Sequence, residues 1–349
     1  MNFEYRSYPN KIIFGTPILD ALEQETDQPK KIFVIGSSRY NELIDEIRSL
    51  PNIEVIHHFE DVIQHVPKSS VDEAIGFLKN FGADIILAIG GGSAVGLAKG
   101  MVLQQPLPIW SVTTTYSGSE VTNIYGVSTD GKKDVGRNDV VMPEKVFYDP
   151  ALSISLPLSL ASTSATNALA HLVEAVYSHK INPVTYELSM LGIKHLLKGI
   201  RSLAEKQKLT EETNEDLLFG AYLAGKSLCE VTMGLHHKTA HVLGGNFGME
   251  HSAVHTVILS YALAYQWEYL SDDLKTDLKR IFDSKNPPAS LKKMIEAMGA
   301  ESTLKNIGFN KNDIPEAAKQ ICAIEFESPA PIEPAGIESM LEKAFNGKI

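Results

Sequence analysis

The stretch Asp84-Ile85-Ile86-Leu87-Ala88-Ile89-Gly90-Gly91-Gly92-Ser93 decides the fold of the N-terminal half of this chain. An apolar run of strand length ends in three glycines, and residues 93–102 then have the pattern of a helix. Glycines let the backbone turn tightly and approach a ligand, and the N–H groups at a helix start attract phosphate. The spacing therefore favours a phosphate-binding turn at the carboxyl end of a strand, although a tight turn without a ligand has the same spacing.

The same rhythm extends to both sides of this turn. Strand patterns occupy residues 31–36, 53–56 and 107–112, and helical patterns occupy 40–50 and 70–81. Ser69 or Ser70 is the expected N-cap of the second of these helices. The alternation predicts a parallel sheet with helices on both faces, a Rossmann-like α/β domain. No Gly-x-Gly-x-x-Gly follows the first strand, so the glycine turn is not the usual dinucleotide-binding fingerprint.

The pattern changes near Asp149-Pro150, and helical spacing dominates from there to the C-terminus. A chain of 349 residues suits two domains. We therefore expect an α/β nucleotide-binding domain over residues 1–150 and an all-α substrate-binding and catalytic domain over residues 151–349. The expected helices span 165–178, 186–203, 214–232, 237–244, 272–282, 289–297 and 335–345, and a proline-rich loop is expected at 328–334.

Composition limits the classes of partner. Hydrophobic residues make up 44% and charged residues 21% of the chain, which is typical of a globular protein. A net charge of -11 without a dense Lys/Arg run argues against a nucleic-acid partner. The N-terminus lacks the pattern of a signal peptide, and no apolar run approaches a membrane span, so we expect a cytoplasmic protein without a membrane partner. Cys229 and Cys322 have no metal-binding spacing.

A second polar turn, Thr113-Thr114-Thr115-Tyr116-Ser117-Gly118-Ser119-Glu120, follows the next predicted strand. Its hydroxyl groups can donate hydrogen bonds to a phosphate or to a nicotinamide amide group. A capped loop without a ligand is the alternative interpretation, so this turn alone is weak support for a nucleotide site.

Histidines are concentrated in the C-terminal half. Imidazole serves both metal ligation and acid–base catalysis, and spacing alone does not choose between them. His171 follows Asn167 by four residues in another predicted helix. A lone histidine is more often a core or surface residue, but five within twenty residues, flanked by glycines, indicate a site. These five are His236, His237, His241, His251 and His255, of which His237 and His241 share one helix face, as do His251 and His255.

Taken in chain order, these motifs resemble the iron-containing alcohol dehydrogenases. The two polar turns are similar to that family's cofactor motifs. Asn167-Ala168-Leu169-Ala170-His171 and the run from His237 to His251 are similar to its metal-binding segments. The resemblance covers nearly the whole chain. It implies a dehydroquinate synthase-like, iron-alcohol-dehydrogenase fold, with the active site in a cleft between the two domains.

Within the family, the maleylacetate reductase branch is the more similar one. The shared motifs are Thr114 to Glu120, Gly136-Arg137, Gly234-Leu235-His236-His237-Lys238 and His241-Val242-Leu243-Gly244-Gly245. This resemblance implies NAD(P)H-dependent reduction of maleylacetate to 3-oxoadipate, a late step in the degradation of aromatic compounds.

Two positions depart from the patterns of the relatives. Metal-dependent members hold their ion with one aspartate and three histidines, and the matching residues here are Asn167, His171, His237 and His251. An amide in place of the carboxylate lowers the expected affinity for a divalent cation, so no metal is expected as a functional requirement. Many branch members carry Asn-Pro-Arg-Pro near the C-terminus, where this chain has Ser328-Pro329-Ala330-Pro331. Ala330 therefore leaves the exact substrate open.

The resemblance implies a role for each matching residue. Hydride adds to the alkene carbon β to the substrate ketone, and imidazole N–H groups stabilise the resulting enolate. His241 is the first candidate for the proton donor, and His171, His237 and His251 are expected to line the same site. Asn167, Tyr116, Arg137 and Lys238 are expected to bind substrate, although a solvated surface charge is an equal alternative for Arg137 and Lys238. The expected cofactor-binding residues are Gly36, Ser37, Gly90, Gly91, Gly92, Ser93, Thr113, Thr114, Tyr116 and Ser119.

The end of the first strand bears on cofactor choice. NAD-specific members carry an acid at the position of Ser37, and here Arg39 is nearby instead. We therefore expect NADPH to be accepted, with or without NADH. A homodimer is also expected, because family members are commonly dimers, sometimes paired through N-terminal strands such as residues 5–8 and 11–15 here.

Three alternatives stay open at this point. The first is a metal-dependent alcohol or aldehyde oxidoreductase, against which Asn167 argues. The second is a lyase related to dehydroquinate synthase, whose dense Lys/Arg set for a phosphate substrate is not evident. The third is a nucleotide-binding sensor without catalysis, against which the clustered histidines argue.

Overall fold

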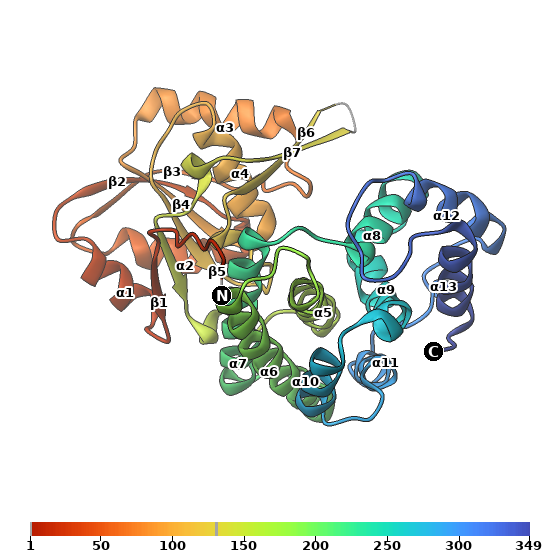
Figure 1. Ribbon diagram of the computed structural model, residues 1–349. Helices are drawn as coiled ribbons and strands as arrows, with labels where there is room; N and C mark the ends of the chain where they lie inside the picture. Colours follow the sequence, from red (N-terminus) through yellow and green to blue (C-terminus); the bar gives the residue numbers. More distant parts are fainter. Residues whose placement is uncertain (1, 130–131) are drawn as a thin grey trace. The chain divides into compact units, whose positions relative to one another are not determined.

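The computed structural model describes residues 2–129 and 132–349 (Figure 1). The chain divides into two compact units. Ser7–Ser155 form the α/β unit, and Leu156–Ile349, together with the N-terminal residues up to Arg6, form the helical unit. The expected fold class, a parallel α/β domain followed by a helical domain, is confirmed.

The α/β unit is built on a six-stranded sheet in which every neighbouring pair is parallel. Its strand order is β1-β8-β5-β4-β2-β3. Parallel strands cannot be joined by a tight turn, and the helices between most of these strands provide the crossover connections that they need. The strands are β1 (Lys11–Phe14), β2 (Lys30–Ile35), β3 (Ile53–Phe59), β4 (Ile85–Gly90), β5 (Ile109–Thr113) and β8 (Lys145–Tyr148).

Alternation along the central strands explains why both faces of the sheet are covered. Phe33 and Ile86 face a core completed by α3 (Lys68–Phe81) and α4 (Gly92–Val102). Their neighbours Ile32 and Leu87 face the opposite core, completed by α1 (Ile18–Glu25) and α2 (Asn41–Arg48). A strand buried on both faces is a continuous apolar run, which is the pattern of β4 and of residues 32–35 in β2.

Several local predictions for this unit are wrong or incomplete. Helix α3 begins at Lys68, directly after Pro67, with no side-chain cap. Ser69 and Ser70 therefore lie inside its first turn and do not cap it. Residues 5–8 form no strand within the chain, and Lys11–Phe14 form β1, which pairs with β8 of the same chain; strand pairing between two subunits stays a prediction. An antiparallel hairpin, β6 (Ile124–Thr129) and β7 (Lys132–Arg137), was not predicted.

The helical unit contains only helices and connecting loops among its described residues. The predicted helices are present, one with the predicted bounds (Asp272–Phe282) and the others with shifted ends, and two further ones, α9 and α12, were not predicted. No described helix is both long and apolar enough to cross a membrane. The helices are α5 (Leu158–Val176), α6 (Pro183–Lys206), α7 (Glu211–Glu230), α8 (Leu235–Asn246), α9 (His251–Gln266), α10 (Asp272–Phe282), α11 (Pro287–Ala297), α12 (Ile314–Cys322) and α13 (Pro334–Asn346).

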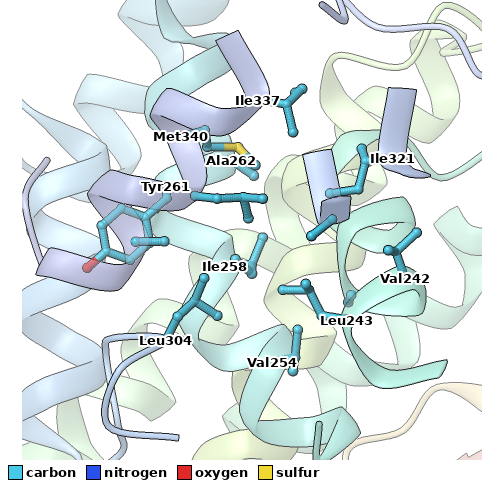
Figure 2. Close-up of a cluster of buried hydrophobic side chains, with 14 of the residues drawn as sticks. Val242, Leu243, Val254, Ile258, Tyr261, Ala262, Leu304, Ile321, Ile337 and Met340 are labelled. Atoms are coloured by element: carbon cyan, nitrogen blue, oxygen red, sulfur yellow. The ribbon is translucent and has the colours of Figure 1, made fainter. Parts of the chain in front are cut away.

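One apolar core fixes α8 and α9 in place. Figure 2 shows Val242 and Leu243 of α8 and Ile258 of α9 in a cluster that includes Ile321 of α12 and Ile337 of α13. Apart from Val242, at 4%, these side chains are fully buried. Burial of one such aliphatic side chain contributes roughly 1.5–3 kcal/mol, so this face of each helix is strongly committed to the core. Other faces of α8 and α9 carry the histidines.

Candidate active site

The strand order of the α/β unit creates a switch point at the carboxyl ends of β2 and β4. The connection from β2 leads to β3 on one side, whereas β4 and β5 lie on the other. Gly36 follows β2 and Gly90 ends β4, and a Cβ on Gly36 would lie 3.3 Å from the carbonyl oxygen of Ile89. Ligands of open parallel sheets bind at such a switch point.

The glycine turn after β4 packs closely against the polar turn after β5. Gly90 has φ of +148°, and a Cβ on Gly91 would lie only 2.5 Å from the Thr115 hydroxyl oxygen. The backbone N–H of Thr114 donates to the Gly90 carbonyl at 3.0 Å. Helix α4 begins at Gly92 with no side-chain cap, so its first N–H groups are left for a ligand or water.

The predicted cofactor-binding residues therefore lie mostly along one edge, named the glycine edge: Gly36, Ser37, Gly90–Ser93 and Thr113–Thr115. The Tyr40 and Thr114 hydroxyls lie 2.8 Å apart there, and the buried Thr113 hydroxyl has no partner. Ser119 is half-buried, with its carbonyl engaged by Lys99. Tyr116 is fully buried, and this burial raises the pKa of its phenol.

A buried pair of charges, missed from the sequence, holds the polar turn. Lys99 of α4 is fully buried, and its ammonium donates to the carbonyls of Ser119, Thr122 and Ile124 at 2.7–2.8 Å. Glu120 is also fully buried and accepts a 2.8 Å hydrogen bond from the Tyr148 hydroxyl. Burial raises the pKa of Glu120, and the Lys99 charge opposes that effect. In the sequence, Lys99 is a single lysine in an otherwise apolar helical segment, and this pattern did not indicate that its side chain is buried.

In the helical unit, three helices bring the predicted histidines together. The rings of His171 on α5 and His237 on α8 stack with centroids 4.6 Å apart. The rings of His241 on α8 and His251 on α9 are 6.0 Å apart. His236 and His255 complete this histidine cluster, with ring centroids 4.9 Å apart. His237 and His241 are four residues apart on α8, as are His251 and His255 on α9. Residues four apart lie on the same face of a helix, so each helix presents two rings on one side.

Glu174 on α5 anchors the cluster, and sequence reasoning missed it. Its side chain is fully buried. One carboxylate oxygen accepts the backbone N–H of His236 at 2.7 Å, and the other accepts that of Gly234 at 3.2 Å and meets His237 Nδ1 at 2.5 Å. Helix α8 begins at Leu235 with no side-chain cap of its own. A carboxylate from another helix therefore caps its positive N-terminus.

Hydrogen bonds fix the tautomers of two rings. The His255 carbonyl can only accept, so His236 donates from Nε2 at 2.9 Å and, when neutral, presents a lone pair at Nδ1. With Glu174 ionised, His237 donates from Nδ1, and its Nε2 presents a lone pair. Neutral His237 in this state accepts a proton at Nε2 rather than donating one.

Burial favours the neutral form of the inner imidazoles. It lowers the pKa of His171 to about 3 and that of His236 to about 4, with neighbouring imidazoles adding to the effect. It also lowers the pKa of His237 and His255 well below the ordinary value. Burial raises the pKa of Glu174 to about 7 against the stabilising backbone hydrogen bonds. His241 and His251 are exposed, so water reaches only the outer part of the cluster.

Four buried polar atoms of this cluster have no hydrogen-bond partner: Asn167 Oδ1, His171 Nδ1, His237 Nε2 and His255 Nδ1. An unsatisfied buried polar atom costs about 1–3 kcal/mol. Several such atoms in one place indicate that a polar ligand or water completes them.

The predicted substrate-binding residues are divided between the units. Asn167 and Lys238 lie on α5 and α8 of the helical unit, and both are half-buried. Arg137 ends β7 of the α/β unit and is exposed, with one guanidinium nitrogen 3.4 Å from Asn123 Oδ1. Ala330 is buried, and its N–H donates to Gln266 at 2.8 Å, so this position faces the interior of the helical unit.

The residues matching the relatives' metal ligands do not form an equivalent donor set. Asn167 supplies a neutral amide oxygen, so the four donors carry no negative charge. Within residues 2–129 and 132–349, two groups of three histidines bring their ring nitrogens within 4.8 Å of one another, and neither includes His171. We therefore derive no catalytic step through a metal at Asn167, His171, His237 and His251.

Comparison with known proteins matches both units to the same protein family. Residues 9–150 match the family described as iron-containing alcohol dehydrogenase, and residues 161–345 match the Fe-containing alcohol dehydrogenase family, C-terminal. Maleylacetate reductase 1 of Cupriavidus pinatubonensis (strain JMP 134 / LMG 1197) is 35% identical over 340 residues, covering 97% of this chain and 96% of that protein. Maleylacetate reductase of Pseudomonas sp. (strain P51) is 33% identical, covering 100% and 99%. The crystal structure of maleylacetate reductase from Agrobacterium tumefaciens has a TM-score of 0.92 at 29% identity, covering 100% of this chain and 99% of that chain.

Proposed function

The chain belongs to the iron-containing alcohol dehydrogenase family, and we propose that it is an NAD(P)H-dependent reductase of maleylacetate. The observation that carries this proposal is the histidine cluster, with Asn167 in place of the metal-binding aspartate and unpartnered imidazole nitrogens beside it. Relatives named maleylacetate reductase, 33–35% identical over almost the whole chain, support the same substrate.

The chemistry needs a hydride donor and a means to hold negative charge. When bound, a reduced nicotinamide would supply a hydride for the alkene carbon β to the ketone, and negative charge would then develop on the ketone oxygen as an enolate. Positioned imidazole N–H groups stabilise such an oxyanion, and one donor typically contributes about 3–4 kcal/mol. His171 and His251 are the candidates for these donors in the proposed site.

His241 is the proposed proton donor to the enolate. Neutral His237 presents a lone pair at Nε2 when it donates to Glu174, so it does not supply a proton in that state. His241 lies at the exposed end of the histidine cluster, where its ring can exchange a proton with water. After each turnover, solvent can restore the proton at this ring. Lys238, half-buried beside His237, is the proposed partner of a substrate carboxylate.

The glycine edge is the proposed cofactor site. Its glycines allow backbone N–H groups to approach a pyrophosphate, and the start of α4 adds a favourable dipole. The absence of an acid at Ser37, and Arg39 nearby, support NADPH as an accepted cofactor.

A substrate panel tests this proposal. Purified protein is assayed for NADPH and NADH oxidation with maleylacetate and, separately, with a series of aldehydes and ketones. The proposal predicts that maleylacetate gives the highest kcat/KM and that the activity survives treatment with a chelator. A preference for simple aldehydes, with activity lost on chelation and restored by a divalent metal, would instead favour a metal-dependent alcohol or aldehyde oxidoreductase.

A further inference from the structure

We propose that His241, His251 and His255 form a binding site for one exchangeable ion of the zinc class, and that the bound ion blocks the proton donor. The ring nitrogens of these three residues lie within 4.8 Å of one another. The site shares only His251 with the four positions that match the family's metal ligands. Its second part, the blocking of His241, rests on the proposed function, whereas the binding of the ion does not.

The distance between two of the nitrogens is close to that of two ligands on one ion. His251 Nε2 and His255 Nε2 are 3.1 Å apart. Two imidazole nitrogens that each bind zinc at about 2.0–2.1 Å lie about 3.3 Å apart in a tetrahedral site. The third nitrogen, on the exposed ring of His241, lies within 4.8 Å of these two and has to move closer when an ion binds.

The chemistry of the donors selects the class of ion. Three neutral imidazoles suit Zn²⁺, Ni²⁺, Cu²⁺ or Co²⁺ and offer little to Mg²⁺ or Ca²⁺, which prefer oxygen. Three histidines with an open fourth position match the known arrangement in which zinc keeps one exchangeable ligand.

Two opposing charges at the start of α9, the positive end of the helix dipole and the Glu250 carboxylate, act on a cation there. His251 is the first residue of this helix, whose N-terminus carries about half a positive charge. Glu250 precedes it and accepts the N–H groups of Ser252 and Ala253 at 3.1 and 2.6 Å. A full carboxylate charge exceeds the partial charge that it caps. The remaining field therefore attracts a cation beside His251.

Solvent access distinguishes the proposed triad from a second, buried group of three histidines. His236, His237 and His255 also gather their nitrogens, but all three are buried. In that group His237 Nδ1 is engaged by Glu174, and His236 Nε2 donates to a carbonyl. His241 and His251 lie at the surface, so an ion can enter and leave without unfolding the cluster.

Calorimetric titration with zinc chloride alone tests the site, using chelator-treated full-length protein without substrate or cofactor. We expect one zinc ion per chain, and binding at least about tenfold weaker in His241→Gln, His251→Gln and His255→Gln. His179→Gln, an exposed histidine of the same unit, is the matched control and should bind like the parent protein. Circular dichroism shows whether each variant is folded. If His255→Gln does not fold, the variants at the exposed positions His241 and His251 still test the site. Magnesium chloride should give no binding heat.

Two results would overturn the site: no stoichiometric zinc binding to the parent protein, or binding lost in His171→Gln and Asn167→Ala but kept in His241→Gln and His255→Gln. If zinc binds as expected but leaves NADPH-dependent maleylacetate reduction unchanged, the blocking of His241 is wrong. A protein that binds zinc in this way but never reduces maleylacetate refutes the proposed function and leaves the ion site standing.

Discussion

The glycine edge of the α/β unit and the histidine cluster of the helical unit are built in opposite ways. At the glycine edge, the groups proposed to bind the cofactor are backbone atoms, and glycines, which have no side chain, let two turns meet. In the histidine cluster, the functional groups are side chains from α5, α8 and α9, held by one buried carboxylate. The first arrangement is set by local sequence, whereas the second depends on contacts between residues far apart in the chain.

The largest effect should come from the exposed end of the histidine cluster. His241→Ala is expected to lower kcat/KM for maleylacetate by about 10²–10⁴-fold, because a positioned general acid contributes that much. Unfolding free energy should barely change, since the ring is exposed. Initial rates of NADPH oxidation measure the effect, with His179→Ala as the control. Unchanged kcat/KM in His241→Ala would remove this residue from the mechanism.

Glu174→Ala should lower the free energy of unfolding of the protein. The substitution leaves two backbone N–H groups and His237 Nδ1 buried without their acceptor. Each buried donor left without its acceptor costs about 1–3 kcal/mol. Urea denaturation gives the change in unfolding free energy. Glu205→Ala, at an exposed position of α6, should change it by less than about 0.5 kcal/mol. Equal effects of the two substitutions would mean that Glu174 is not an anchor.

Substitution of a glycine at the glycine edge should weaken cofactor binding through overpacking. A Cβ at Gly91 would meet the Thr115 hydroxyl oxygen at 2.5 Å, and the two turns would have to separate. Such overpacking costs typically about 1–3 kcal/mol, which corresponds to roughly 5–150-fold weaker cofactor binding. Quenching of protein fluorescence by NADPH measures the dissociation constant for Gly91→Ala. Gly76→Ala on α3, where a Cβ meets nothing within 4 Å, should bind NADPH normally.

The smallest effect concerns cofactor choice. Arg39 is exposed, and its guanidinium donates to the Ser155 hydroxyl at 2.7 Å. If it also meets the 2′-phosphate, an exposed charge pair of this kind changes affinity by about twofold to fivefold. Arg39→Ala should therefore weaken NADPH and leave NADH unaffected in the same titration. A parent enzyme with a strong preference for NADH in initial rates would contradict the assignment.

Local sequence was sufficient for the glycine edge. The apolar run of β4 and the glycines after it predict a strand, a turn and a helix with no knowledge of distant residues, and this succession is observed. The pairing of Lys99 with the 119–124 backbone could not be predicted, because it joins segments more than 20 residues apart. The hairpin of β6 and β7 was missed because its strands lack an apolar run, and the side chains of residues 124–129 and 134–137 are half-buried or exposed.

For the histidine cluster, spacing predicted which residues share a helix face but not how the helices meet. Residues 251–266 form α9, which was not predicted, although the pairing of His251 with His255 was. Glu174 resembled an ordinary helical glutamate in the sequence, and only the packing of α5 against the start of α8 reveals its partners. The cap expected from Ser69 or Ser70 failed because Pro67 starts α3 two residues earlier.

Deuterium transfer from NADPH labelled at the reactive nicotinamide carbon tests the central proposal, that the imidazoles support reduction of a conjugated alkene, most directly. After reaction with maleylacetate, the proposal predicts deuterium on the methylene carbon β to an intact ketone in 3-oxoadipate, observed by mass spectrometry and NMR. Deuterium on a newly formed carbinol carbon, where the ketone itself has been reduced, would contradict it.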